Sequence, residues 1–118
     1  MNKDYIYNAL KSEGLTDDQI TFEKDRTVQT DEGFFSWRVE HGYPYITHFY
    51  VDKNKRNHRS ALALWKAFKR DVEGHDFIIA EVLPEKEYLN RFCLFLTQGR
   101  PHYAEVEGRK YYFIRVAK

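Results

Sequence analysis

The segment that most constrains the fold is a strand that runs directly into a helix, between residues 45 and 68. Tyr45 to Val51 is rich in aromatic and β-branched residues, which is typical of a strand. Apolar residues then recur at helical spacing, which predicts an amphipathic helix over Asn57–Glu73. A continuous apolar run, Phe77–Leu83, follows and predicts a buried strand. Because a helical crossover joins these two strands, we expect them to lie parallel.

Turn signals divide the rest of the chain into short elements. The early strands are separated by short turns at residues 31–33 and 42–44, so we expect an antiparallel meander. The other expected elements are a helix at Asp4–Ser12, strands at Ile20–Thr30, Phe34–His41 and Tyr45–Asp52, a helix at Glu85–Gln98, and a closing hairpin of His102–Glu107 and Lys110–Val116. The predicted fold class is therefore α/β (α+β): a mixed, mostly antiparallel sheet flanked by helices in the order α-β-β-β-α-β-α-β-β. Residues 1–118 form a single domain.

Charge and cysteine content limit the class of protein. The formal net charge is only +1, which disfavours general attraction to nucleic acid. The single Cys93 cannot form an internal disulfide, which favours a reducing compartment. No stretch has the length and apolarity of a signal peptide core or a membrane span. We therefore expect a soluble cytoplasmic protein without a membrane partner.

The loop between the strand and the helix carries a cluster of cations: Lys53, Lys55, Arg56 and Arg59. A helix N-terminus presents free N–H groups and the positive end of the helix dipole, and nearby cations add charge. This arrangement predicts a phosphate site at the loop. The alternative is a solvated cationic face, to which Lys66 and Arg70 on the outer side of the helix belong.

The same segment resembles the GNAT superfamily of N-acetyltransferases. Its pyrophosphate loop has the pattern Arg/Gln-x-x-Gly-x-Gly/Ala, and Arg56 and Ala61 match the first and last positions. Arg59 departs from the pattern because it stands where the family has a glycine. In a second family motif, Leu94, Phe95 and Gly99 match the leucine, aromatic and glycine positions. The compact chain is also similar to small GNAT-fold proteins encoded by bacteriophages.

The resemblance implies an acetyl-CoA-dependent N-acyltransferase that acts on an unidentified amine. Backbone groups of the strand would hold the pantetheine arm, and the loop would hold the pyrophosphate. The residues implied in acetyl-CoA binding are Phe49, Val51, Arg56, Asn57, Arg59, Ser60 and Ala61. Phe95 replaces the tyrosine that often protonates the departing thiolate in the family, so Tyr88 and Tyr103 are the candidate general acids.

Glu81 is the leading candidate for a general base because it interrupts an apolar strand, and Glu40 and His48 are the other choices. A buried carboxylate requires a compensating partner, so a salt bridge to a helix arginine or a position at a strand edge is the alternative for Glu81. The alternating pattern around His48 favours a hydrogen-bonded sheet residue. Cys93 lies on the apolar stripe of its helix, where a packed core thiol is expected. The histidines show no metal-ligand spacing, so no metal site is expected.

Two other functions compete with the enzyme. A GNAT-fold protein without catalysis could act through protein–protein contacts, which the Arg59 and Phe95 departures and the aromatic residues Tyr43, Tyr45 and Tyr111 favour. A nucleic-acid-binding module could use the cationic face, but the near-neutral charge and the absence of a recognisable motif argue against it. The partner is accordingly an amine or another protein, and a homo-oligomer is compatible with both.

Overall fold

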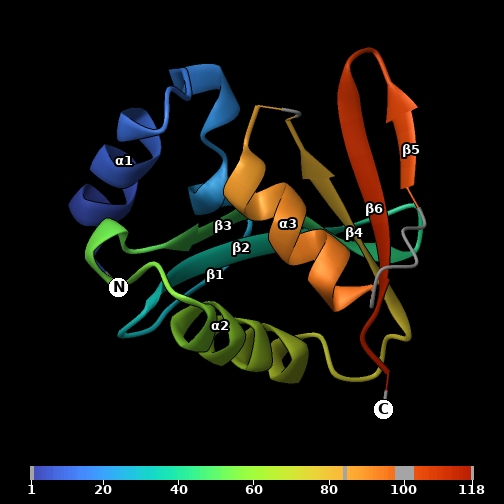
Figure 1. Ribbon diagram of the computed structural model, residues 1–118. Coiled ribbons are helices and arrows are strands. Elements are labelled where there is room, and N and C mark those ends of the chain that lie inside the picture. The colour runs from blue at the N-terminus through green and yellow to red at the C-terminus, as the bar shows by residue number, and fades with distance from the viewer. Residues whose placement is uncertain (1, 84, 98–102, 118) are drawn as a thin grey trace.

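Helices flank a single sheet in the computed structural model of the chain, which describes residues 2–83, 85–97 and 103–117 (Figure 1). The helices are α1 (Lys3–Ser12), α2 (His58–Asp71) and α3 (Glu87–Leu96), with 3₁₀ turns η1 (Asp17–Gln19), η2 (Phe22–Lys24) and η3 (Lys53–Lys55). The strands are β1 (Arg26–Gln29), β2 (Gly33–Glu40), β3 (Tyr43–Val51), β4 (Phe77–Val82), β5 (Tyr103–Val106) and β6 (Arg109–Arg115). None of the helices in this described part is long and apolar enough to cross a membrane.

The sheet is mixed and mostly antiparallel, as the sequence predicts. Its spatial order is β1-β2-β3-β4-β6-β5. Only β3 and β4 pair in parallel among the described strands, and α2 supplies the crossover between them. The helices and strands follow one another along the chain in the expected order.

Helices cover the two faces of the sheet unequally. On one face, α2 and α3 pack on alternate strand residues and form the larger core, which includes Phe35, Leu64, Phe68, Ile78 and Ile114. On the other face, α1 and the turn η2 cover the β1–β3 side, with Ile6, Leu10, Phe22, Phe34 and Tyr50 in a second core. The neighbours Phe34 and Phe35 point to opposite cores, as the alternation of a strand requires.

A β-bulge in β3 ends its pairing with β4. Ser36 lies opposite His48 and Trp37 lies opposite Ile46, so Thr47 is the extra residue of the bulge. The parallel pairing covers only two positions, Tyr45 with Ile79 and Ile46 with Ala80. Because a bulge bends its strand, β3 turns away from β4 directly after this contact. Figure 1 shows the two strands diverging, with α3 lying across the widening.

The extended segment predicted for Ile20–Thr30 is wrong in its first half. This half contains the turn η2, and the strand β1 begins only at Arg26. Local hydrogen bonds explain the difference. The Thr27 hydroxyl donates to the Phe22 carbonyl at 2.6 Å, and the Thr21 hydroxyl donates to the Asp25 carboxylate at 2.7 Å. Such side-chain bonds compete with strand pairing.

The predicted turn at residues 42–44 is also displaced. Tyr43 and Pro44 belong to β3, and the turn is made by His41 and Gly42, which both have positive φ. Two such residues are typical of a tight hairpin turn. Other boundaries differ by one or two residues, which is the usual uncertainty of element ends. The predicted ends at Gln98 and His102 lie outside the described residues.

Gly33 provides a test of the β2–β3 register. A Cβ atom at this position would lie 1.9 Å from the Tyr50 carbonyl oxygen, so β3 would have to move. We expect Gly33→Ala to lower the free energy of unfolding by roughly 2–4 kcal/mol in a denaturant titration. Gly42→Ala is the matched control, because its Cβ meets open space and only the positive φ costs about 1–2 kcal/mol. Equal losses in the two variants would contradict the close approach.

Candidate functional site

The divergence of β3 and β4 brings together residues from distant parts of the chain at the end of β3. The guanidinium of Arg56 lies 5.2 Å from the Tyr50 ring centroid and 5.7 Å from that of Tyr88. Arg56 also forms an ion pair with Glu13, which follows α1, and Lys86 lies 3.5 Å from the same carboxylate. We call these five residues the strand-end cluster. Arg56 and Tyr88, which the sequence nominates separately, therefore share one site.

Arg56 is held firmly within the strand-end cluster. Its Nε donates to the Val51 carbonyl at 3.0 Å, in addition to the ion pair and the two ring contacts. Partial burial acts to raise the pKa of Glu13, but the net pKa is lowered because Arg56 and Lys86 stabilise the carboxylate. The guanidinium is therefore committed to joining α1, β3 and α3, and it does not project freely toward the start of α2.

Tyr88 carries the most unusual group of the strand-end cluster. Its hydroxyl oxygen is buried and has no hydrogen-bond partner among the described residues. Burial raises the pKa of this hydroxyl, although the nearby Arg56 acts to lower it. The group therefore keeps its proton at neutral pH. An unsatisfied buried hydroxyl costs about 1–3 kcal/mol of stability. Such groups are rare in folded proteins, and a catalytic role is one reason for keeping them.

The start of α2 is built by capping and packing. The Asn57 side chain accepts a hydrogen bond from the Ser60 N–H at 2.8 Å, as an N-cap residue does. Ala61 is 1% exposed and packs in the core under α2 and α3. Arg59 is exposed, and no ion pair holds it within the described part of the chain. Lys55 and Arg56 are exposed as well, but the Lys55 ammonium donates to the Asp31 carbonyl at 2.7 Å and Arg56 pairs with Glu13. Arg59 and Lys53 are thus the exposed cations at this helix start that have no ion pair within the described residues.

The side chains of Phe49 and Val51 point into the core, so only their backbone groups face the region where β3 and β4 diverge. The Phe49 ring stacks on Phe92 of α3 at 5.8 Å, and the Val51 side chain is fully buried. These side chains belong to the core beneath α2 and α3. Any ligand contact by these two residues would therefore use their peptide N–H and C=O groups.

Glu81 lies on the opposite face of the sheet from Tyr88. Its neighbours Ala80 and Val82 point into the core under α2 and α3, so Glu81 points away from it. The carboxylate accepts a hydrogen bond from the Tyr45 hydroxyl and forms an ion pair with Arg109 of β6. Partial burial acts to raise the pKa of Glu81, but these two partners give a net lowering. A salt bridge compensates the carboxylate, and it comes from a strand arginine rather than a helix arginine.

The remaining residues that the sequence analysis discusses as parts of a site lie outside the strand-end cluster. Tyr103 belongs to β5, and its side chain lies outside the described part. Glu40 pairs with Arg38 at 2.8 Å near the end of β2. Phe95 is 50% exposed, and its ring meets that of His58 at 4.5 Å, so α3 contacts the first residue of α2.

His48 belongs to a buried polar network that sequence reasoning missed. Its Nε2 accepts a hydrogen bond from the Thr21 N–H at 3.1 Å. The nearby Asp25 carboxylate accepts from Thr47 at 2.8 Å and pairs with Arg38 at 3.3 Å. Burial lowers the pKa of His48 to about 4, with Asp25 opposing and Arg38 reinforcing the shift. The imidazole is neutral, and the prediction of a hydrogen-bonded sheet residue is confirmed.

Cys93 is buried, and burial raises the pKa of its thiol to about 12. A thiol with so little thiolate is a poor nucleophile, in agreement with the expected core role. Within residues 2–83, 85–97 and 103–117, no group of three or more His, Cys, Asp and Glu side chains could hold a metal ion.

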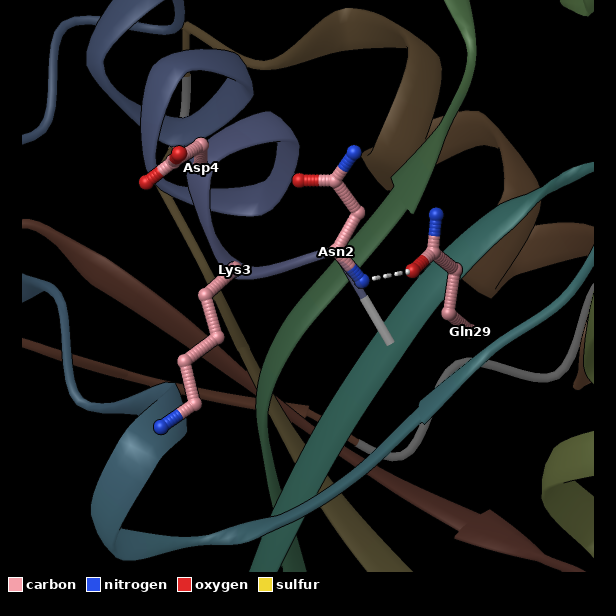
Figure 2. Close-up of a pocket in the computed structure, with 4 residues that line it drawn as sticks. All are labelled: Asn2, Lys3, Asp4 and Gln29. Carbon is pink, nitrogen blue, oxygen red and sulfur yellow. Dashed lines mark hydrogen bonds between the residues drawn. The ribbon is translucent and has the colours of Figure 1, made fainter.

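A hollow at the start of α1 is lined by Asn2, Lys3, Asp4 and Gln29 (Figure 2). The Asn2 N–H donates to the Gln29 side chain at 2.7 Å, and the Asn2 side chain accepts from the Tyr5 N–H at 3.0 Å. Figure 2 shows the side chains of Lys3 and Asp4 pointing in different directions. These groups tie α1 to β1 and do not converge on a common point.

The pKa of His48 predicts a pH dependence of stability. An unfolded histidine titrates near 6.5 and the folded one near 4, so between these values the unfolded state binds more protons. The free energy of unfolding therefore falls as the pH is lowered through this window, by at most about 1.4 kcal/mol per pH unit for one group. His48→Gln retains an acceptor for Thr21 and should flatten the slope in denaturant titrations from pH 7 to pH 4. Equal slopes would contradict the assignment, because the carboxylates titrate in both proteins.

Two of the predicted residues, Arg56 and Tyr88, are in direct contact. Helix α2 begins two residues after Arg56, so its first turn lies next to this pair. Glu81 points to the other face of the sheet. Glu13 and Lys86 complete the strand-end cluster without any local sequence signal. Comparisons with protein-family models, curated proteins and solved structures give no match, so a function has to be argued from this geometry.

Proposed function

We propose that the chain is a GNAT-like N-acyltransferase that transfers an acetyl group from acetyl-CoA to an amine. The observation that carries the proposal is the divergence of β3 and β4 after the Thr47 bulge, with α2 starting shortly after β3. Peptide groups of β3 that have no β4 partner can bind an extended amide-containing ligand such as pantetheine. A strand N–H in the same place can polarise the thioester carbonyl.

Tyr88 is the proposed general acid. Its buried hydroxyl has no partner in the described part, and its raised pKa preserves the proton until a stronger base appears. The thioester supplies the acetyl group and a thiolate leaving group. The amine nitrogen forms the new C–N bond as the C–S bond breaks, and Tyr88 gives its proton to the departing sulfur. The amine loses its own proton to solvent, and solvent restores the proton of Tyr88.

The first turn of α2 is the proposed binding site for the phosphate groups of acetyl-CoA. Free N–H groups of the first turn and the exposed cations Arg59 and Lys53 suit a diphosphate. A glycine at this position lets the backbone approach the phosphates closely. In this chain the charge of the Arg59 side chain would take the place of that backbone contact. Arg56 acts differently from the family expectation, because it positions Tyr88 through their ring contact.

Location and origin are part of the same proposal. The buried, reduced Cys93 suits the cytoplasm, where thiols persist. A relation to the small bacteriophage-encoded GNAT proteins rests on the sequence resemblance alone.

A second candidate is a GNAT-like protein without catalysis that acts through protein contacts. Two observations favour it: Arg56 is committed to Glu13, and Phe95 contacts His58 at the start of α2. Such a protein would show no response to CoA.

Thermal unfolding with acetyl-CoA separates these functions. At about 100 times its Kd, a ligand adds roughly 2.7 kcal/mol of stability. We expect a shift with acetyl-CoA but not with an equal concentration of ATP, and a smaller shift in Arg59→Ala. Lys66→Ala on the outer side of α2 is the matched control. The absence of a shift at roughly millimolar acetyl-CoA would contradict a CoA site and favour the interaction protein.

Tyr88→Phe should separate catalysis from stability. Removing the unsatisfied hydroxyl should leave the free energy of unfolding unchanged or raise it by about 1 kcal/mol, while the rate of acetyl transfer falls about 10²–10⁴-fold. Tyr112→Phe is the control, because that hydroxyl donates to Asn90 at 2.7 Å and its loss should cost about 1 kcal/mol. A destabilised Tyr88→Phe protein would show that the hydroxyl has a structural partner.

A further inference from the structure

The outer side of α2 carries a straight row of cations. Arg59, Lys66 and Arg70 follow one another at spacings of seven and four residues, which places them on one face of the helix. This face is opposite the buried positions of α2, and all three side chains are exposed. Lys69 is exposed beside the row, and we call these four residues the α2 ridge. In Figure 1, α2 lies at the lower edge of the molecule, and no other element crosses its outer side.

The protein does not neutralise the α2 ridge with its own acids. Among the described residues, none of the four ridge side chains forms an ion pair. The single acid in the sequence of α2, Asp71, is committed to Arg26 and to the Trp37 indole N–H, which donates to it at 2.7 Å. Lys66 and Arg70 are also one helical turn apart, where like charges repel each other. The free protein therefore keeps uncompensated positive charge on this face.

Helix stability explains only part of the α2 ridge. Cations in the last turn of a helix interact favourably with its dipole, which accounts for Lys69 and Arg70. Arg59 stands in the first turn, where the dipole disfavours a cation, and Lys66 lies in the middle of the helix, where the dipole has little effect. The diphosphate proposed at the first turn would reach Arg59 but not Lys66, which is about 10 Å further along the helix axis. A longer anion is needed to offset the charge of the whole ridge.

The surroundings of the α2 ridge favour a phosphate backbone over a protein surface. Protein interfaces contain an apolar centre, and the exposed large apolar side chains in the described part of the chain all belong to elements other than α2. A row of like charges matches the regularly repeated charge of a nucleic-acid backbone. Single strands are bound largely by stacking on aromatic rings, but Trp65 and Phe68 of α2 are buried. The straight ridge therefore suits a stiff duplex.

We propose that the α2 ridge binds the phosphate backbone of double-stranded DNA without reading its sequence. The ridge is about 16 Å long, and the two strands of DNA present roughly ten phosphates over that length. The net charge of only +1 confines the attraction to this face, so the complex is weak and sensitive to salt. With four cations on phosphates, the slope of log K against log salt concentration is about −3.6. This binding does not depend on the proposed acyl transfer.

Fluorescence anisotropy with a labelled DNA duplex of about 20 base pairs tests the proposal between roughly 25 and 150 mM NaCl. We expect binding with a slope of about −3 to −4 and equal affinity for two duplexes of unrelated sequence. No binding at about 25 mM salt and roughly 100 µM protein, a slope shallower than about −2, or tighter binding of the single strand would overturn the proposal.

Variants locate the contact. Lys66→Gln combined with Arg70→Gln should weaken duplex binding at least about tenfold at roughly 50 mM salt and make the slope shallower by about 2. The matched control is Lys3→Gln combined with Lys24→Gln, because it lowers the net charge equally at exposed positions of α1 and η2. Equal losses in the two double variants would overturn the proposal. If the ridge double variant does not fold by circular dichroism, Lys66→Gln alone decides, and an unchanged slope overturns the proposal.

The outcome is distinguishable from a failure of the proposed function. Lys66 and Arg70 lie beyond the first turn of α2, so the ridge double variant should keep its thermal shift with acetyl-CoA. A CoA-induced shift without duplex binding would reject the DNA contact and retain the acyltransferase. Duplex binding without a CoA shift would retain the DNA contact and reject the acyltransferase.

Discussion

The bulge at Thr47 is the local feature on which the candidate site depends. Its extra residue is held by hydrogen bonds rather than by strand pairing: the Thr47 hydroxyl lies 2.6 Å from that of Ser36 and donates to Asp25 at 2.8 Å. The Asp25 side chain is almost completely buried and also pairs with Arg38. Hydrogen bonds to a charged group contribute about 1.5–3 kcal/mol each, enough to offset the ladder bonds that the bulge removes. The bent strand then leaves β4 after two paired positions.

The divergence determines what the neighbouring elements can do. On one face it leaves room for α3, whose Tyr88 meets Arg56 and, through it, Glu13 at the end of α1. On the other face, Tyr45 of β3 and Ile79 of β4 line a groove together with Tyr111 and Phe113 of β6. The proposed acyl transfer needs a donor and an acceptor to meet at one point, and the proposal assigns that point to the divergence of β3 and β4.

Local sequence patterns predicted most elements and one strand pairing, but not the side-chain partners of the candidate residues. Helical spacing in α2, the apolar run of β4 and the crossover between them were sufficient to predict the parallel pair. The bulge could not be predicted, because it depends on the register of β3 against β2. The partners of Arg56 and Glu81 were also missed, since Glu13 and Arg109 are distant along the chain. The η2 turn was missed because threonine and aspartate bonds outweighed a strand-like pattern.

The central claim is that β3 beyond the bulge offers its peptide groups to an acyl-CoA. Amide hydrogen exchange with and without acetyl-CoA tests it most directly. We predict added protection in residues 48–51 and in the first turn of α2, with β1 and the outer side of α2 unchanged. Protection confined to other parts of the chain, or none at a saturating ligand concentration, would contradict the claim.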